Sequence, residues 1–391
     1  MTLFLMTFFL IYGGMHFYLF TRIRNAIPMN TGAAICLVFL FVLMILAPLA
    51  VRLAERHGLE SFARFTAYTG YIWMGVMFIF FMVSLLLDLY RLILGGGGIL
   101  FHGGVARLQP SPLFLLIFPA FIALTVNAYG YFEAMDVKIN VLTFSSPKIP
   151  EKIGRVRIVQ ISDVHIGIVV REERLKGIVE KIHSVDPDIL ISTGDLLDGQ
   201  IDNLEGSIAL LKSIQPKYGK FAVMGNHEYY AGLDESIDFT TRSGFSILRD
   251  EGTIVSGSIN IVGMDDPVGR RLGLAKNIEK ETLLSEFPGE NFTLLLKHQP
   301  IVDSASVGMF DLQLSGHTHG GQIFPFCLIT RIFFPTHTGY YEFARQSRLY
   351  VNRGAGTWGP PIRFLAPPEI TVIDLVHTKN DPTLTHKERS S

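Results

Sequence analysis

Five apolar, β-branched segments in the second half of the chain each end beside a side chain that can bind a metal ion. They are residues 156–161 before Asp163 and His165, 189–193 before Asp195 and Asp198, 221–224 before Asn226 and His227, 293–297 before His298, and 312–315 before His317 and His319. Short runs of this composition are typical of buried strands. Because α/β proteins gather their sites along the carboxyl edge of a sheet, the pattern predicts one shared site. The sequence therefore points to a hydrolase with two metal ions.

The residue types at these strand ends suit two closely spaced divalent cations. Imidazole and carboxylate groups bind Zn, Mn and Fe, and two such ions about 3.5 to 4 Å apart can hold the attacking and leaving oxygens of a phosphoryl transfer. Asp195 is the natural bridge, because a carboxylate offers one oxygen to each ion. Asp163 and His165 alternate along an extended segment and can face one ion, while Asn226 offers a neutral oxygen. The predicted set is completed by three histidines, His298, His317 and His319.

These ordered blocks resemble those of the calcineurin-like metallophosphoesterases over about residues 155–375. The blocks are Asp163-x-His165, Gly194-Asp195-x-x-Asp198, Gly225-Asn226-His227-Glu228, His298 and Gly316-His317-x-His319. The resemblance implies a four-layer αββα sandwich with two divalent ions (Mn, Fe or Zn) that activate water as the nucleophile. It implies one ion bound by Asp163, His165, Asp195 and His319, and the other bound by Asp195, Asn226, His298 and His317.

The resemblance also implies a catalytic role for a histidine that is not a metal ligand. His227 is expected beside the metals, where it stabilises the transition state or protonates the leaving oxygen. A carboxylate such as Asp198 is expected to orient it.

Segments after the last block resemble one branch of the family, and they indicate a substrate class. They are Gly320-Gly321-Gln322, Asn352-Arg353-Gly354 and residues 358–364. The branch contains YkuE- and YaeI-like phosphoesterases and transmembrane proteins with a metallophosphoesterase domain. It implies lipid-linked phosphate substrates, including the pyrophosphate of UDP-2,3-diacylglucosamine. Protein phosphatases of the superfamily place an arginine after the second block, whereas Gly199 and Gln200 follow Asp198 here. A lipid phosphodiester or pyrophosphate is therefore expected rather than a phosphoprotein.

Two other functions remain open on the sequence alone. One is a phosphodiesterase of broad specificity on soluble substrates, and the other is an inactive membrane sensor of a phosphorylated ligand. A missing ligand would favour the sensor, but all seven ligand positions are filled. A lone Asp-x-His is usually structural, which does not explain five ordered blocks. His337 lies in a loop that could also reach the site.

The first third of the chain is apolar enough to lie in a lipid bilayer. With 49% hydrophobic and 18% charged residues, the whole chain is too apolar for a fully soluble protein of this length. A bundle of four transmembrane helices is predicted at about residues 1–20, 31–51, 65–94 and 113–131. The first run lacks the basic start and the cleavage motif of a signal peptide. Asp88 and Arg91 are expected to pair near the end of the third helix, and the glycines at 95–98 are expected to end it.

The predicted organisation follows from these runs and blocks. It is a membrane domain at 1–132, a linker and edge strand at 133–152, a metallophosphoesterase domain at 153–376 and a disordered tail at 377–391. Arg52, Arg56 and Arg64 make the second loop the most basic, which favours a cytoplasmic position for that loop, both termini and the catalytic domain. We expect a multi-pass protein of a bacterial plasma membrane. A net charge of -1 disfavours nucleic acid as a partner.

A further apolar segment, residues 323–334, follows the last ligand pair. It either packs into the core or forms a lip that enters the bilayer beside the site and receives an acyl chain. The lip is favoured, because the chain is already tethered to a membrane. Trp358 and Phe364 would extend this lip, and Arg331 or Arg363 would meet the substrate phosphate.

Overall fold

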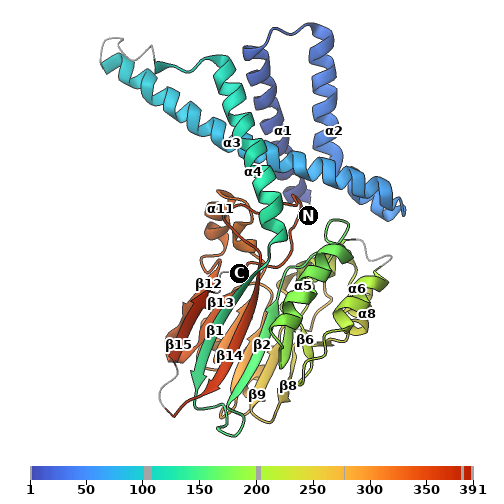
Figure 1. The fold of residues 1–391 in the computed structure, drawn as a ribbon, viewed down its shortest axis with the longest axis vertical. Helices are drawn as coiled ribbons and strands as arrows, with labels where there is room; N and C mark the ends of the chain where they lie inside the picture. Colours follow the sequence, from blue (N-terminus) through green and yellow to red (C-terminus); the bar gives the residue numbers. More distant parts are fainter. Residues whose placement is uncertain (1, 101–107, 200–203, 277, 380–382, 389–391) are drawn as a thin grey trace. The chain divides into compact units, whose positions relative to one another are not determined.

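The computed structural model describes residues 2–100, 108–199, 204–276, 278–379 and 383–388 (Figure 1). The chain divides into two compact units. One comprises residues 1–132 with 359–362, and the other comprises residues 133–358 with 363–391. We call the first the helical unit and the second the sheet unit.

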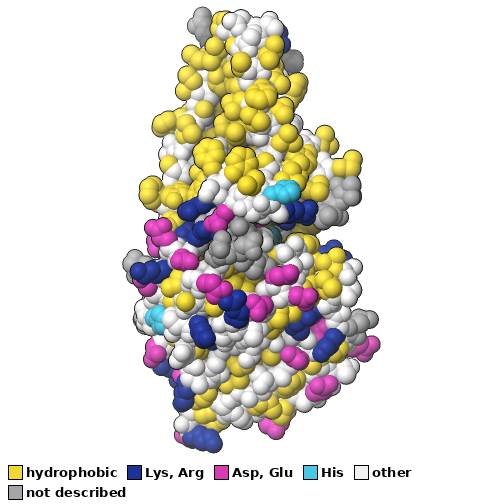
Figure 2. Space-filling model, turned by 90° about the vertical axis from the view of Figure 1, so that its right-hand side faces the viewer, with side chains coloured by type: hydrophobic (Ala, Val, Ile, Leu, Met, Phe, Trp, Pro, Cys, Tyr) yellow, Lys and Arg dark blue, Asp and Glu magenta, His cyan; other side chains and the backbone are white. Residues whose placement is uncertain are grey.

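Four long helices make up the helical unit, and the last three residues of the fourth belong to the sheet unit. The helices are α1 (Thr2–Ala26), α2 (Thr31–Arg56), α3 (Glu60–Leu100) and α4 (Pro112–Met135). Asn30 caps α2, because its side-chain oxygen accepts a hydrogen bond from the Ala33 amide at 2.8 Å. On the face drawn in Figure 2, hydrophobic side chains dominate the surface of this unit, whereas charged side chains are spread over the sheet unit. Such an apolar outer surface suits a lipid environment.

Three of these helices are long and apolar enough to cross a bilayer, by length and composition alone. Among the described residues they are α2, Glu60–Gly95 of α3, and α4. The sequence predicts four spans, and α1, whose second half includes His16, Arg22 and Arg24, is not among the three. α3 continues through the glycines at 95–98 to Leu100, so the predicted helix end is wrong. Each glycine weakens a helix by only about 0.5–1 kcal/mol, and this run does not stop it.

One polar cluster joins α1 to α3. The Asp88 carboxylate accepts a hydrogen bond from the Tyr18 hydroxyl at 2.6 Å and one from Arg91 Nη1 at 3.2 Å, and it pairs with Arg22. Arg22 Nη2 also donates to the Tyr18 oxygen at 2.5 Å. The expected Asp88–Arg91 pair is thus joined by a second arginine from another helix. The charge of Asp88 is therefore balanced by side chains of the same unit.

Two mixed sheets form the centre of the sheet unit (Figure 1). The larger has the order β15 (Thr383–Glu388), β1 (Lys138–Ser146), β14 (Glu369–His377), β2 (Arg155–Ile161), β4 (Ile189–Ser192), β6 (Lys220–Ala222) and β7 (Ser246–Ile247). The smaller has the order β12 (Gly339–Glu342), β13 (Arg348–Val351), β11 (Leu312–Ser315), β10 (Phe292–Leu296), β9 (Ile259–Gly263) and β8 (Glu251–Val255). β3 (Ile166–Gly167) and β5 (Leu197–Asp198) form a separate pair.

The two sheets pack face to face, and helices cover their outer faces. On β2, Val156 and Ile158 lie in the hydrophobic cluster between the sheets, whereas Val159 and Ile161 lie in the cluster on the outer face. The outer face of the larger sheet is covered by α5 (Glu172–Ser184), α6 (Glu205–Lys212) and α8 (Leu233–Arg242), and that of the smaller by α10 (Lys280–Ser285). The connections contain α7 (Asn226–Ala231), α9 (Pro267–Arg271), α11 (Phe326–Phe333) and 3₁₀ turns at Ser304–Ser306, His319–Gly321 and Ala344–Gln346.

Two predictions about the ends of the sheet unit are wrong. β1 is not an edge strand, because it pairs with β14 in parallel and with β15 in antiparallel fashion. Residues 383–388, predicted to be part of a disordered tail, form β15. A free strand edge presents a row of unpaired backbone N–H and C=O groups, and these can pair with a polar segment as well as with an apolar one.

Candidate metal centre

The predicted ligands meet at one edge of the sheet unit. Asp163 follows β2, Asp195 follows β4, and Asn226 begins α7 after β6. His298 follows β10, and His317 follows β11. β2, β4 and β6 are parallel neighbours, and so are β10 and β11, so each set of strands delivers its ligands to one edge. All seven candidate ligands except the half-buried His317 are buried.

Asp163, His165 and His319 form the first of three overlapping groups of potential ligands, one of which joins His227 to His165 and Asp195. The Nε2 atoms of His165 and His319 are 3.0 Å apart, and His319 Nε2 is 3.5 Å from Asp163 Oδ1. Their potential ligand atoms all lie within 4.8 Å of one another, the spacing expected around one ion.

Asp195, Asn226, His298 and His317 form the second group. His298 Nε2 lies 3.1 Å from Asp195 Oδ2, 3.2 Å from Asn226 Oδ1 and 3.1 Å from His317 Nδ1. Asp195 Oδ2 is also 3.9 Å from His165 Nε2, so this carboxylate lies between the two groups. Although burial opposes the charged form, the negative charge of Asp195 raises the pKa of His298 well above its ordinary value. A positive charge is therefore favoured beside Asp195.

The protonation of the other imidazoles fits divalent cations. Burial lowers the pKa of His165 to about 4 and that of His317 to about 3, and it lowers the pKa of His319 well below its ordinary value. Neutral imidazole is the form that binds a metal. His165 Nδ1 is buried and has no hydrogen-bond partner among the described residues. Buried nitrogen and oxygen atoms that face one another and carry few protons are suitable ligands for Zn, Mn or Fe.

Five of the candidate ligands have a left-handed backbone conformation. φ is 50° at Asp163, 54° at His165, 51° at Asp195, 74° at His317 and 52° at His319. A positive φ at a non-glycine residue costs on the order of 1–3 kcal/mol, and Asp and His are among the residues that tolerate it best. Such strain is concentrated at functional sites. The backbone here is shaped to aim these side chains at a common point.

Glu228 holds the turn that carries Asp195. Its carboxylate accepts hydrogen bonds from the backbone amides of Asp195 at 3.0 Å, Leu196 at 2.6 Å, Leu197 at 3.1 Å and Gly225 at 2.8 Å. Glycine is required at 225, because a Cβ there would overlap the Asp195 carboxylate. The motif contains Glu228, but no pattern in the sequence indicates this role, since the turn it holds lies about thirty residues earlier.

His227 is held between two carboxylates. Its Nδ1 lies 2.9 Å from Asp198 Oδ1, and its backbone amide donates to Asp195 Oδ1 at 2.9 Å. Although burial opposes the charged form, Asp195 and Asp198 raise the pKa of His227 to about 9. The Trp358 ring meets the imidazole edge to face, with 5.6 Å between the ring centroids. One ring nitrogen of His227 is thus fixed by Asp198, and the other is the atom that can carry a proton to or from a bound molecule.

The three predicted substrate residues differ in their exposure to solvent. Arg363 is fully buried, and its guanidinium donates to backbone carbonyls that include those of Gly356 at 2.6 Å and His319 at 2.9 Å. The same guanidinium lies 3.1 Å from His319 Nδ1. The prediction that Arg363 meets a substrate phosphate is therefore wrong, because its donors are used inside the protein, where they orient a candidate ligand. Arg331 and Trp358 are exposed.

The segment after α11 also reaches the metal centre. The rings of Phe334 and His317 meet edge to face, with 4.9 Å between centroids. The carbonyl of His337 accepts a hydrogen bond from Thr318 Oγ1 at 2.5 Å, so this loop lies against the last ligand block. The imidazole of His337 is not in any of the candidate ligand groups found among the described residues.

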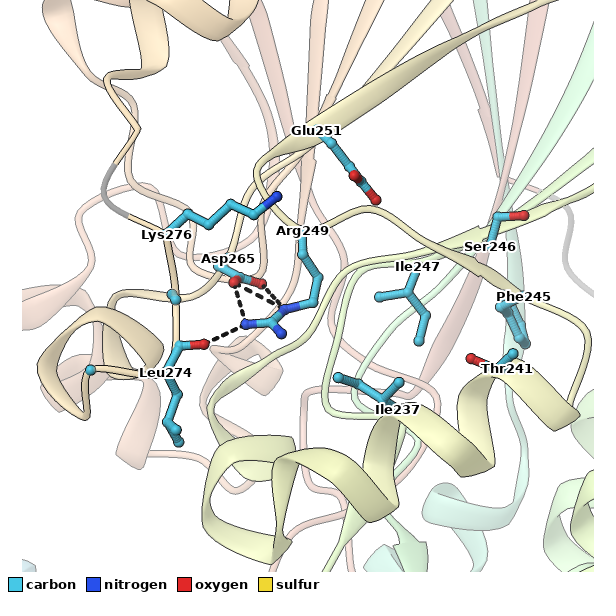
Figure 3. A pocket seen from close by; sticks show the side chains of 12 residues that line it. Ile237, Thr241, Phe245, Ser246, Ile247, Arg249, Glu251, Asp265, Leu274 and Lys276 are labelled. Carbon is cyan, nitrogen blue, oxygen red and sulfur yellow. Dashed lines mark hydrogen bonds and ion pairs between the residues drawn. The ribbon is translucent and has the colours of Figure 1, made fainter.

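A separate hollow of about 750 Å³ lies beside α8, β7 and β8 (Figure 3). Its lining includes Ile237, Phe245 and the ion pair of Arg249 with Asp265, whose closest N–O distance is 2.7 Å. Arg249 also donates to the carbonyl of Leu274 at 2.6 Å, so its guanidinium is engaged by the protein. No candidate metal ligand is among the residues that line the hollow, and we assign it no role in the site.

Comparison with known proteins agrees with the pattern of ligands. Residues 156–321 match the family described as calcineurin-like phosphoesterase. An uncharacterised metallophosphoesterase of Aquifex aeolicus is 38% identical over 65% of this chain and 98% of its own length. The uncharacterised metallophosphoesterase YkuE of Bacillus subtilis is 34% identical over 66% of this chain and 93% of its own length. A transmembrane protein with metallophosphoesterase domain of Danio rerio is 32% identical over 64% of this chain and 59% of its own length.

A solved structure gives a weaker likeness. The match to the crystal structure of a dimetal phosphatase from Danio rerio covers 60% of this chain and 96% of that chain, with 11% identity and a TM-score of 0.39. The segment that matches the family contains every candidate metal ligand, and the Aquifex protein is matched over almost its whole length. The chain therefore belongs to the calcineurin-like phosphoesterase family and is a metal-dependent phosphoester hydrolase.

Proposed function

We propose that this protein is a membrane-anchored phosphoesterase with two divalent ions, drawn from Mn, Fe and Zn. The first ion would be held by Asp163, His165, Asp195 and His319, and the second by Asp195, Asn226, His298 and His317. The observation that carries the proposal is the position of Asp195 Oδ2, which is 3.9 Å from His165 Nε2 and 3.1 Å from His298 Nε2. When bound, such a pair of ions activates water and stabilises the charge that develops in phosphoryl transfer.

The proposed general acid is His227. Asp198 fixes its Nδ1, so Nε2 is the nitrogen that would donate a proton to the leaving oxygen of the substrate. Asp198 would act as a positioning residue that keeps the ring oriented. Glu228 and Arg363 would hold Asp195 and His319 in place without touching the substrate.

The proposed substrate is a lipid-linked phosphodiester or pyrophosphate, such as a phospholipid or a UDP-2,3-diacylglucosamine-like molecule. Two aromatic side chains support this class, because they bring apolar surface directly to the reacting groups. Trp358 contacts His227, and Phe334 contacts His317. A substrate with an apolar part beside its phosphate would bury that part against these rings.

The proposed topology has four spans, with α1 as the fourth beside the three candidate helices. The 25 residues of α1 are enough to cross a bilayer core of about 30 Å. Pairing of Arg22 and Tyr18 with Asp88 of α3 supports the placement of α1 within the same bundle. The basic second loop supports a cytoplasmic sheet unit, in a plasma membrane of the bacterial type.

The test is turnover of a substrate panel by the full chain with Mn or Zn added. The panel contains a soluble bis-ester, a lipid phosphodiester and a nucleotide-linked lipid pyrophosphate. Asn226→Ala is expected to lose turnover of each substrate that the wild type hydrolyses, because one ion loses an oxygen ligand. Asn291→Ala is the matched control, since Asn291 is as buried as Asn226 but binds Asn260 away from the site.

Each outcome of the panel separates the candidate functions. Unchanged turnover by Asn226→Ala would contradict the metal assignment. Turnover of the soluble ester without either lipid would favour a phosphodiesterase of broad specificity. Metal binding without any turnover would favour an inactive sensor.

A further inference from the structure

α11 presents an apolar surface to its surroundings instead of packing into the core. Leu328 and Ile329 are 55% and 43% exposed, and Ile332 and Phe333 are 76% and 73% exposed. Residues four apart lie on the same side of a helix, so these four side chains form one continuous stripe. Thr330, on the other side, is buried. The exposed fractions exclude core packing as the reason for this apolar sequence.

Neighbouring segments enlarge the stripe. Phe324 before α11 is 42% exposed, and Leu365 is 67% exposed. The two stretches are adjacent, because Phe324 N donates to the Phe364 carbonyl at 3.0 Å. Monomeric soluble domains seldom expose a contiguous apolar patch of this kind without using it to bind something.

We call the edge of the larger sheet at which the candidate ligands lie the catalytic edge. The chain enters the sheet at this same edge from its last candidate membrane helix. Lys138, the first residue of β1, pairs with Glu369, and Thr371 two residues later in β14 pairs with Gln160 near the end of β2. β1 therefore begins where β2 ends, and Asp163 follows directly. α4 ends at Met135, so at most about 10 Å of chain leads from that helix to β1.

The start of β1 is fixed beside the metal centre by hydrogen bonds within the sheet unit. Arg174 of α5 donates to the carbonyl of Ala134 at 3.0 Å and to Thr357 Oγ1 at 3.2 Å. Thr357 precedes Trp358, whose ring contacts His227. Figure 1 shows α11 at this same end of the sandwich. The candidate membrane helix α4 is therefore joined by a short stretch of chain to the end of the sheet unit that contains both the candidate ligands and α11.

We infer that α11, with Phe324 and Leu365, inserts into the interfacial layer of the lipid bilayer and docks the catalytic edge on the membrane. The stripe would lie among the upper acyl chains, and the exposed Arg331 on the same helix would extend to the phosphate headgroups. Phe334, the next residue after α11, would then join the lipid phase to the metal centre through its contact with His317. A lipid phosphoester would reach the site without leaving the membrane. This last step rests on the proposed function, whereas the docking itself does not.

Depth-dependent fluorescence quenching tests the docking on the full chain. The protein, with Cys36→Ser and Cys327→Ser, is reconstituted into phosphatidylethanolamine and phosphatidylglycerol vesicles. A polarity-sensitive dye is attached at Ile332→Cys or Phe333→Cys. The control is Ile254→Cys, an exposed apolar position on β8. Ile254 pairs with Asn260 near the start of β9, and it therefore lies far from the end of β9 at Gly263. Labels at 332 and 333 are expected to shift to shorter wavelength and to lose more fluorescence than the control with lipids that carry a quencher on the acyl chain.

Two results would overturn the inference. One is quenching at 332 and 333 no greater than at 254. The other is protection of both labels from lipid quenchers together with disulfide formation between two chains that carry Ile332→Cys, which would assign the stripe to a second copy of the protein.

Turnover gives a second readout that separates docking from the proposed function. The double variant Ile332→Gln and Phe333→Gln is expected to lose a larger fraction of its activity on a lipid phosphodiester in vesicles than on a soluble bis-ester. Equal losses on both substrates would remove the link between docking and substrate access. If the wild type hydrolysed neither substrate, the proposed function would fail while the quenching result would still decide the docking.

Discussion

The two units of this protein each contain a cluster of polar side chains, and the clusters handle charge in opposite ways. In the helical unit, the Asp88 carboxylate meets Arg22, Arg91 and the Tyr18 hydroxyl. In the metal centre, the Asp195 carboxylate lies among imidazoles, and burial keeps several of these in the metal-binding, neutral form. The first cluster is balanced by the chain itself, while the second requires cations from outside.

The difference separates a structural polar cluster from a functional one. A carboxylate that is paired with arginines within the fold needs no further positively charged partner. A set of buried acceptors that point at one another is unfavourable until a cation joins them. Each variant below changes one cluster, and its readouts separate effects on metal binding, turnover or stability, so that the contrast itself is tested.

Asp195→Asn is expected to have the largest effect. Asparagine keeps the size of the side chain but removes the charge that lies between both groups of ligands. We expect turnover to fall about 10⁴-fold or more, as for the loss of a central catalytic group. Metal analysis of the purified protein should show fewer bound ions than in the wild type. Full metal content with wild-type turnover would contradict a shared bridging role.

His227→Gln is expected to lower kcat by about 10²- to 10⁴-fold, the range for loss of a general acid. Glutamine can still bind Asp198 but cannot deliver a proton. Because His227 is not a proposed ligand, bound metal should match the wild type. A loss of metal equal to that of Asp195→Asn would show that His227 is a ligand instead.

Arg363→Lys is expected to weaken metal binding by about 10- to 100-fold, because an ammonium group cannot replace the planar donors that hold the backbone carbonyls of His319 and Gly356. Turnover should recover when excess metal is added. Titration of metal-free protein with Mn or Zn gives the affinity. A raised KM at unchanged metal affinity would instead support direct contact of Arg363 with the substrate.

Asp88→Asn is expected to have the smallest effect on chemistry. It leaves Arg22 without its carboxylate partner, which should destabilise the helical unit by about 1–3 kcal/mol. Turnover of a soluble bis-ester should stay within about twofold of the wild type. Thermal unfolding in detergent measures the first quantity. Loss of turnover at an unchanged unfolding temperature would show that Asp88 serves function and is not only structural.

Local sequence was enough to predict the candidate ligands that the structure brings together, because each lies shortly after its strand. Asp163 and His319 are far apart in the chain, yet each belongs to a short block whose strand brings it to the same edge. The role of Arg363 was not predictable in this way. Its donors reach the carbonyl of His319 only because the fold brings Arg363 beside a residue that is distant from it in the chain.

Errors in the predicted fold have a similar origin. The pairing of β15 with β1 depends on a vacant strand edge, which no pattern within residues 383–388 reports. The glycine run in α3 was expected to stop a helix, but a small cost per residue is outweighed by the long apolar helix that precedes it.

The sequence by itself determined the residue types of the metal centre, their order, and the apolar first third of the chain. These features depend on short motifs and on hydrophobic runs, whose residues are close together in the chain. Only the tertiary structure decided that Arg363 is buried, that α11 is exposed, and that β1 begins at the catalytic edge. Burial and strand order arise from contacts between segments distant in the chain, and local sequence carries no direct record of such contacts.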